Sequence, residues 1–162
     1  MVILLMGVMG SGKTALGRAL ARALDGRFFD ADDAHSPENR HRLARGEALS
    51  EADREPWIAE VARVLAQPHA EPLVVACSAL RRAHRDRLRD ACPDLHLVFL
   101  CPTVATLQRR LAARRDHFAS PALLGSQLDT LEPPERDEGA IVVDNEDTVE
   151  AVTARLLSTL VD

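Results

Sequence analysis

Residues 7–14 read Gly-Val-Met-Gly-Ser-Gly-Lys-Thr and match the pattern G-x-x-x-x-G-K-[ST] of a phosphate-binding loop. In such a loop, backbone N–H groups turn inward around phosphate oxygens, and the helix that follows adds its positive N-terminal end. We expect the lysine charge to reach the β and γ phosphates of ATP and the threonine hydroxyl to ligate Mg²⁺. The residues that we expect to bind the nucleotide are Gly7, Gly10, Ser11, Gly12, Lys13 and Thr14.

Lys13 adds a second signal to this loop. The chain has twenty basic residues, and because Lys13 is its single lysine, the other nineteen are arginines. A compact ammonium group can follow a phosphate where the broad, planar guanidinium of arginine does not fit. A sequence that uses arginine at every other basic position but keeps lysine here indicates a catalytic phosphate site, rather than a glycine turn that only caps a helix.

Two carboxylates follow closely. Asp30 and Asp32 stand two residues apart where the expected strand over residues 27–30 ends, and open α/β sheets bind ligands at the carboxyl ends of their strands. One carboxylate could accept the proton of an alcohol while the other helps to hold Mg²⁺ through water. We assign the proton to Asp32 and the metal to Asp30, although the sequence alone leaves this choice open. The alternative is a solvated turn rich in aspartate.

Two pairs of arginines could supply positive charge around a migrating phosphoryl group. Arg110 and Arg114 lie four residues apart on one expected helix and lead into a polar loop. This arrangement suits a lid over residues 114–122 that closes over ATP and excludes water. Arg81 and Arg85 lie near the carboxyl end of the third strand, where they could bind an anionic acceptor. For both pairs the alternative is a solvated arginine face.

These residues need a frame of alternating strands and helices, and the apolar pattern predicts one. The expected strands cover residues 2–6, 27–30, 72–77, 95–101 and 141–144. The helices between them include a short one over 37–45, a long one that ends near residue 67 with Pro56 in its first turn, and a closing one over 149–160. Such alternation predicts an α/β fold, a doubly wound parallel sheet of about five strands with helices on both faces.

Length and composition narrow the class of protein. At 162 residues the chain suits one domain, 1–162, in which residues 35–67 form a helical segment that binds the acceptor. A net charge of −5 and only five aromatic residues argue against nucleic-acid binding. The three cysteines show no metal-ligand spacing, no apolar stretch is long enough to span a membrane, and the first strand lacks a charged leader. We therefore expect reduced thiols and a cytoplasmic protein with no nucleic-acid or membrane partner.

The order of the motifs resembles the small, bacterial-type gluconokinases, which are relatives of shikimate and adenylate kinases among the P-loop small-molecule kinases. The resemblance covers nearly the whole chain, and the joint occurrence of the motifs at matching spacing is far more specific than the loop alone. The matching segments after the loop are Asp30-Ala31-Asp32, His35, Asn39, 46–49, 53–57, 77–80, 110–118, 126–134 and Val143-Asp144.

The resemblance implies ATP-dependent phosphorylation of D-gluconate at its 6-hydroxyl, giving 6-phospho-D-gluconate and ADP, and it allows a homodimer. Gluconate carries one carboxylate and many hydroxyls, so it needs arginine for the acid and carboxylate or histidine for the hydroxyls. Our candidates for the acid are Arg54, Arg81 and Arg85. Our candidates on the hydroxyl side are Asp32 and His35, with Asp30 beside them.

Departures from the family pattern leave other acceptors open. Ala31 replaces a glycine, Arg42 a lysine and His84 a tyrosine, and these changes could alter acceptor selectivity. One alternative is a kinase for another small hydroxy acid such as shikimate, although Cys77-Ser78-Ala79 stands where shikimate kinases carry a glycine triplet. A second is a non-catalytic nucleotide-binding module of the GTPase type. That module needs Asn-Lys-x-Asp, which a chain with lysine only at position 13 does not have.

Overall fold

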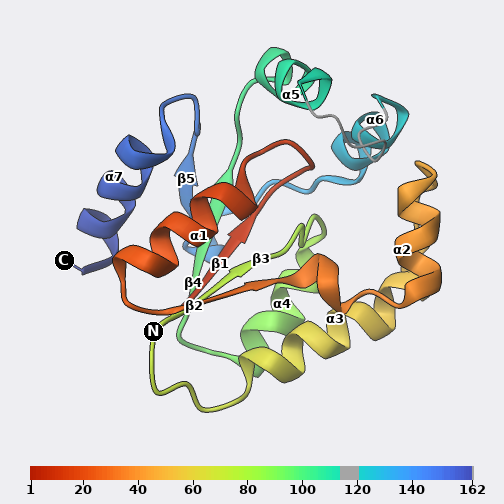
Figure 1. Ribbon diagram of the computed structural model, residues 1–162. Helices are drawn as coiled ribbons and strands as arrows, with labels where there is room; N and C mark the ends of the chain where they lie inside the picture. Colours follow the sequence, from red (N-terminus) through yellow and green to blue (C-terminus); the bar gives the residue numbers. More distant parts are fainter. Residues whose placement is uncertain (114–120, 162) are drawn as a thin grey trace.

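A single parallel sheet forms the centre of the computed structural model, which describes residues 1–113 and 121–161. The sheet has the order β2-β3-β1-β4-β5, and every neighbouring pair is parallel (Figure 1). Its strands are β1 (Val2–Met6), β2 (Arg27–Asp30), β3 (Leu73–Ala76), β4 (Leu95–Leu100) and β5 (Ile141–Val143). The predicted doubly wound α/β fold is confirmed.

Helices cover both faces of the sheet because the buried strands are apolar on both sides. Successive residues of β1 alternate between the faces. Ile3 and Leu5 pack with α1 (Lys13–Ala23) and α7 (Val149–Val161), whereas Leu4 and Met6 belong to the cluster that holds α3 (Glu51–Leu65) and α4 (Arg82–Ala91). An unbroken apolar run therefore marks a strand buried on both faces.

The remaining helices gather near the end of the sheet from which the phosphate-binding loop emerges (Figure 1). They are α2 (Pro37–Ala44), α5 (Val104–Ala112) and α6 (Pro121–Thr130). The chain also forms two short 3₁₀ helices: η1 (Ala31–Ala34) directly follows β2, and η2 (Arg136–Glu138) precedes β5. Because β1 lies between β3 and β4, the strand order reverses there, and ligands of such sheets bind at this point.

The helices α2 and α3 begin directly after serine residues that cap them, but the position of a proline within α3 differs from the prediction. Ser36 accepts a hydrogen bond from the backbone of Asn39 and starts α2, and Ser50 forms a reciprocal capping box with Asp53 at the start of α3. From the sequence we expected Pro56 in the first turn of this helix. Because α3 begins at Glu51, Pro56 lies in the second turn instead. Proline has no N–H, so the helical hydrogen bond at this position is lost.

Two expectations from composition concern the thiols and the membrane. The three cysteines are free, and burial raises the pKa of Cys77 to about 12, so this thiol is inert at neutral pH. Among the described residues, none of the helices has both the length and the apolar character that crossing a membrane requires.

Candidate active site

A cavity of about 700 Å³ opens at the carboxyl end of the sheet. The phosphate-binding loop and the start of α1 form one end, with η1 beside them, and α2 and α3 form the opposite end. The cavity brings together six side chains that the sequence predicted as site residues: Lys13, Thr14, Asp30, Asp32, His35 and Arg54. A volume of this size accommodates small-molecule substrates.

The phosphate-binding loop depends on glycine for its backbone. Gly10 and Gly12 have φ angles of +79° and +98°, which residues with a side chain rarely adopt. A Cβ atom at Gly12 would also lie 2.5 Å from the side-chain nitrogen of Asn145. Lys13 lies over the loop and donates hydrogen bonds to the carbonyl oxygens of Gly7 (2.9 Å) and Val8 (3.0 Å). The ammonium group is thus already at the mouth of the loop.

Asn145 braces this loop, and sequence reasoning missed it. Its Nδ2 donates to the carbonyl of Ser11 at 2.5 Å, and its own carbonyl accepts from Nη2 of Arg110 at 2.6 Å. Asn145 is buried with a φ of +48°, a conformation that asparagine tolerates well. The one available signal was its place directly after the Val143-Asp144 motif.

Two other residues also hold the loop. Nη1 of Arg110 makes long contacts of 3.5 and 3.4 Å with the carbonyls of Gly10 and Ser11. The structure therefore places Arg110 against the phosphate-binding loop, and its role in binding the nucleotide stays a prediction. From α6, Oε1 of Gln127 accepts the backbone N–H of Met9 at 2.7 Å. The helix that follows the expected lid is thus bonded directly to the loop.

Thr14 and Asp30 form a pair beside the loop. The Thr14 hydroxyl donates to Oδ2 of Asp30 at 3.0 Å, and Oδ1 of Asp30 accepts the backbone N–H of Asp32 at 3.2 Å. Hydroxyl and carboxylate oxygens are ligands that Mg²⁺ accepts, usually with several waters retained. The donor set next to the phosphate loop therefore fits Mg²⁺. Asp32 also lines the cavity, two residues further along the chain.

His35 lies stacked on Trp57 in the wall of the cavity. The ring centroids are 4.5 Å apart with an interplanar angle of 11°, and the indole N–H donates to the carbonyl of Ala31 at 2.7 Å. Burial, aided by the charges of Arg54 and Arg40, lowers the pKa of His35 to about 4. His35 is therefore neutral at pH 7. Its buried Nδ1 has no hydrogen-bond partner among the residues that the structure describes.

The carboxylate of Glu51 lies among three basic side chains at the acceptor end of the cavity. Its carboxylate accepts hydrogen bonds from Arg54 (2.6 Å) and Arg81 (2.9 Å), and it lies 2.9 Å from Nε2 of His84. Burial alone would raise its pKa, but the hydrogen bonds from Arg54 and His84 hold the pKa of Glu51 below its usual value. Arg54 and His84 line the cavity, while Arg81 reaches the site through Glu51. Sequence reasoning missed Glu51, which shows no signal beyond its place after the cap of α3.

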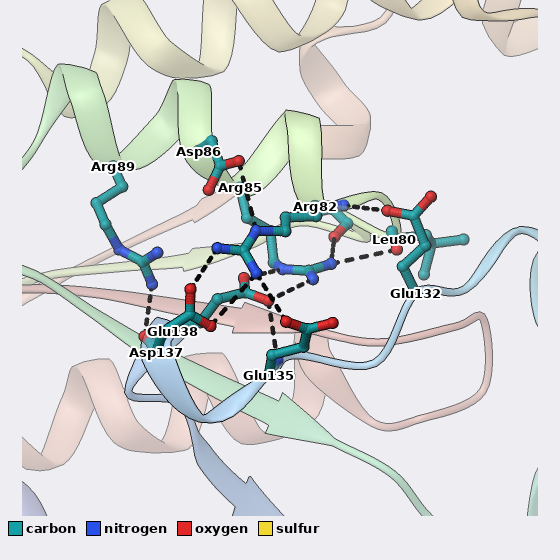
Figure 2. Close-up of polar contacts among 10 residues, drawn as sticks. Leu80, Arg82, Arg85, Asp86, Arg89, Glu132, Glu135, Asp137 and Glu138 are labelled. Carbon is teal, nitrogen blue, oxygen red and sulfur yellow. Dashed lines mark hydrogen bonds and ion pairs between the residues drawn. The ribbon is translucent and has the colours of Figure 1, made fainter.

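Arg85 does not occupy the predicted place. Its guanidinium is 1% exposed and binds Glu138 through two hydrogen bonds, and Nη1 donates to the carbonyls of Ala79 and Leu80 (Figure 2). This placement contradicts the expectation that Arg85 contacts the acceptor. The physical reason is the turn of α4, which directs residue 85 into the core beside Leu88.

Around this pair, α4 is fastened to the segment that connects α6 to β5. The Arg82 guanidinium binds Asp137 and Glu135, its backbone N–H donates to Glu132, and Arg89 donates to the carbonyl of Glu138 (Figure 2). Most of these groups are exposed and so contribute little each. The buried Arg85–Glu138 pair is the part that fixes the connection. Arg114 and most of the predicted lid lie outside the described residues.

Comparison with known proteins places these features in a wider context. The sequence model of the shikimate kinase family matches residues 9–160. The probable gluconokinase of Mus musculus is 38% identical, with 98% of this chain and 97% of that protein covered. The thermoresistant gluconokinase of Escherichia coli strain K12 is 35% identical, with 98% and 93% covered. A crystal structure of a gluconokinase from Sinorhizobium meliloti 1021 is 39% identical and superimposes with a TM-score of 0.84 over 98% of this chain and 94% of that one.

Proposed function

Because the chain belongs to the shikimate kinase family and its relatives over nearly the full length are gluconokinases, we propose that it phosphorylates D-gluconate with ATP. The product is 6-phospho-D-gluconate, and the second product is ADP. One observation supports this most directly: the cavity has a phosphate-binding loop at one end, two carboxylates beside it and arginine at the other end. A hydroxyl and a carboxylate at opposite ends of one acceptor match this order of groups.

At the phosphate end, the loop backbone cradles the β and γ phosphates, and Lys13 supplies the mobile positive charge. In the structure, Lys13 donates hydrogen bonds to the carbonyls of Gly7 and Val8, so it already lies beside the loop that holds the phosphates. Thr14 directly and Asp30 through water would hold Mg²⁺, which neutralises charge that develops on the transferred phosphoryl group. Their hydrogen bond places both oxygens on the same side of the loop.

At the reacting centre, the oxygen of the 6-hydroxyl attacks the γ phosphorus. Asp32 accepts the proton that this hydroxyl loses. The new O–P bond forms as the bond from the γ phosphorus to the bridging oxygen breaks, and ADP leaves with that oxygen. The backbone N–H of Asp32 donates to the carboxylate of Asp30, which fixes the backbone of residue 32 relative to that carboxylate. Positioning of this kind, rather than covalent chemistry, is the main contribution of the protein to phosphoryl transfer.

At the acceptor end, neutral His35 is available to hydrogen-bond a hydroxyl through the Nδ1 that lacks a partner among the described residues. Arg54 binds the carboxylate of gluconate. Its guanidinium is oriented by Glu51, which also accepts a hydrogen bond from Arg81. Arg85 has no part in acceptor binding. Residues 35–67 form the acceptor-binding segment of a single domain, 1–162.

We further propose that Arg110 and Arg114 act on the nucleotide side, with residues 114–122 as a lid. Arg110 contacts the carbonyls of the phosphate-binding loop, and this supports a role beside the nucleotide. A homodimer remains a separate proposal that rests on the family resemblance, and light scattering of the purified protein tests it.

The test of the function is product analysis after incubation with ATP, Mg²⁺ and gluconate. We expect equal amounts of ADP and a gluconate monoester whose ³¹P signal couples to the two protons at C6. The S. meliloti and E. coli relatives named above are controls for the assay. Formation of ADP without a phosphorylated acid, or a strong preference for shikimate, would overturn the proposal.

A further inference from the structure

The arginines that line the cavity differ in how their charge is already used. Arg18 lies over the ring of Phe28, with its Cζ 5.7 Å from the ring centroid, and Arg54 binds Glu51 at 2.6 Å. Arg40 also lines the cavity, yet no carboxylate of the described residues lies within ion-pair distance of its guanidinium. Arg18 likewise has no carboxylate within ion-pair distance among the described residues, but it lies on α1. Of the two cavity-lining arginines on α2 and α3, Arg40 is therefore the one without an acidic partner in the described part of the chain.

The helix α2 fixes the place of Arg40 at the acceptor end. Ser36 caps this helix, and the backbone N–H of Arg40 donates to the carbonyl of Ser36 at 2.9 Å, within its first turn. Arg40 of α2, Arg54 of α3 and His35 all line the cavity, and the charges of both arginines contribute to the lowered pKa of that ring. Two guanidinium groups from two different helices thus line the cavity together with a neutral imidazole.

The cavity is acidic beside the phosphate-binding loop and basic at the end formed by α2 and α3. The carboxylates of Asp30, Asp32 and Asp33 belong to β2 and η1, next to the phosphate-binding loop. At the end formed by α2 and α3, the cavity is lined by Arg40 and Arg54 together with the apolar side chains of Leu43 and Leu49. An acceptor whose hydroxyl reaches Asp32 would direct its far end toward this positive region.

We propose that Arg40 binds the carboxylate of the acceptor together with Arg54 and makes the enzyme select acidic over neutral polyols. This inference rests on the proposed function and deepens it, because it names a specificity residue beyond those that the sequence singled out. Arg54 is held in place by its ion pair with Glu51, which Arg81 shares, and serves mainly to orient the acid. Arg40 supplies the net charge that a neutral polyol cannot use. Hydrogen bonds between two charged groups are stronger than neutral ones, so an acceptor with a carboxylate binds more tightly here than a neutral polyol.

The test compares Arg40→Gln with Arg45→Gln. Arg45 ends the same helix, is also exposed and pairs with Glu47 away from the cavity, so it is a matched control. Steady-state kinetics are measured with gluconate and with glucitol, which has the same carbon chain but a hydroxymethyl group in place of the carboxylate. Gluconate binding by calorimetry without ATP gives a readout that does not depend on turnover.

We expect Arg40→Gln to raise the KM and the Kd for gluconate about 10- to 100-fold, as the loss of a charged hydrogen bond predicts, with kcat changed less than about threefold. The preference for gluconate over glucitol should narrow by the same factor, the KM for ATP should stay constant, and Arg40→Lys should recover part of the affinity. Arg45→Gln should match the parent protein. Equal KM and Kd values for gluconate in the Arg40 and Arg45 variants would overturn the inference.

Failure of the proposed function gives a different pattern. If the parent protein prefers another acidic acceptor, gluconate is wrong as the substrate, and the same comparison with that acid and its neutral analogue still decides the role of Arg40. If the parent protein prefers a neutral acceptor, both proposals fall.

Discussion

Arg85 and Glu138 form an ion pair within the protein core, with Nε to Oε2 at 2.5 Å and Nη2 to Oε1 at 2.8 Å (Figure 2). The side chains are 1% and 0% exposed, and the hydrogen bonds from Arg85 hold the pKa of Glu138 below its usual value. Nη1 of Arg85 donates to the carbonyls of Ala79 and Leu80. One side chain therefore joins the segment after β3, which lines the cavity, to the segment that follows α6.

Breaking this pair should destabilise the fold strongly. Arg85→Met leaves a buried carboxylate without its partner, and we expect the free energy of unfolding to fall by about 3 to 5 kcal/mol. Glu138→Gln keeps the shape of the side chain and should cost less, because the remaining hydrogen bonds can still form. Urea denaturation measures both values.

A double-mutant cycle provides the control. Arg85→Met combined with Glu138→Gln should destabilise the protein by clearly less than the sum of the two single changes, since the second change removes the unpaired charge. Additive losses, or an Arg85→Met protein as stable as the parent, would show that the pair does not join the two segments.

The error over Arg85 shows where sequence reasoning reaches its limit. An arginine-rich helix after a strand predicts several cations near the sheet edge, but which of them points inward depends on the start and turn of that helix. Glu138, its partner, lies 53 positions away in a segment that the sequence marked only as following a linker. Long-range ion pairs of this kind leave no local pattern.

Asp30 and Asp32 should respond differently to Mg²⁺ when each is changed to asparagine. Asp30→Asn weakens metal binding, so its loss of activity should shrink as the Mg²⁺ concentration is raised. Asp32→Asn removes the proton acceptor, and we expect kcat to fall about 100-fold or more at every Mg²⁺ concentration. Titration of both variants with Mg²⁺ at saturating ATP measures this. If Mg²⁺ restores Asp32→Asn instead, the two roles are exchanged.

His35 should make stability depend on pH. Its pKa is about 4 in the folded protein and 6.5 in the unfolded chain, so the unfolded state binds more protons between these values, and stability is lost as the pH falls through this window. Between about pH 7.5 and about pH 5 the expected loss is roughly 1 to 2 kcal/mol after screening by solvent in the cavity.

His35→Phe is the matched control for this effect, because phenylalanine keeps an aromatic ring on Trp57 and does not titrate. The difference in unfolding free energy between the parent and this variant should therefore change with pH in the stated direction. A difference that stays constant from about pH 7.5 to about pH 5 would mean that the ring is not buried as neutral imidazole.

Asn145 should affect nucleotide binding through its bond to Ser11. Loss of that bond in Asn145→Ala should raise the Kd for ATP about 5- to 30-fold, as a hydrogen bond of about 1 to 2 kcal/mol predicts, while the fold persists. Asn145→Asp should bind ATP more weakly still, because a carboxylate would face the Ser11 carbonyl. If the left-handed backbone at residue 145 were the cause, aspartate would instead be tolerated better than alanine. Fluorescence titration with a labelled ATP analogue separates these outcomes.

The phosphate end of the site was largely predictable, and the acceptor end only in part. The loop, Thr14 and Asp30 follow from short sequence motifs whose geometry is local, and the structure brings them together. The positions of Glu51, Asn145 and Arg40 in the site could not be predicted from the sequence, because they depend on how separate helices and loops pack together. Their roles depend on which partners they have, and partners are set by the fold.

The most direct measurement is the ratio of kcat/KM for gluconate to that for shikimate, taken with the same enzyme, ATP and Mg²⁺. The family model bears the name of shikimate kinase, whereas the full-length relatives are gluconokinases, so this ratio decides between the two acceptors. The account predicts a ratio of about 1,000 or more, since a site that hydrogen-bonds one acceptor discriminates strongly against another that leaves its polar groups unpaired. A ratio near one, or one that favours shikimate, would contradict it.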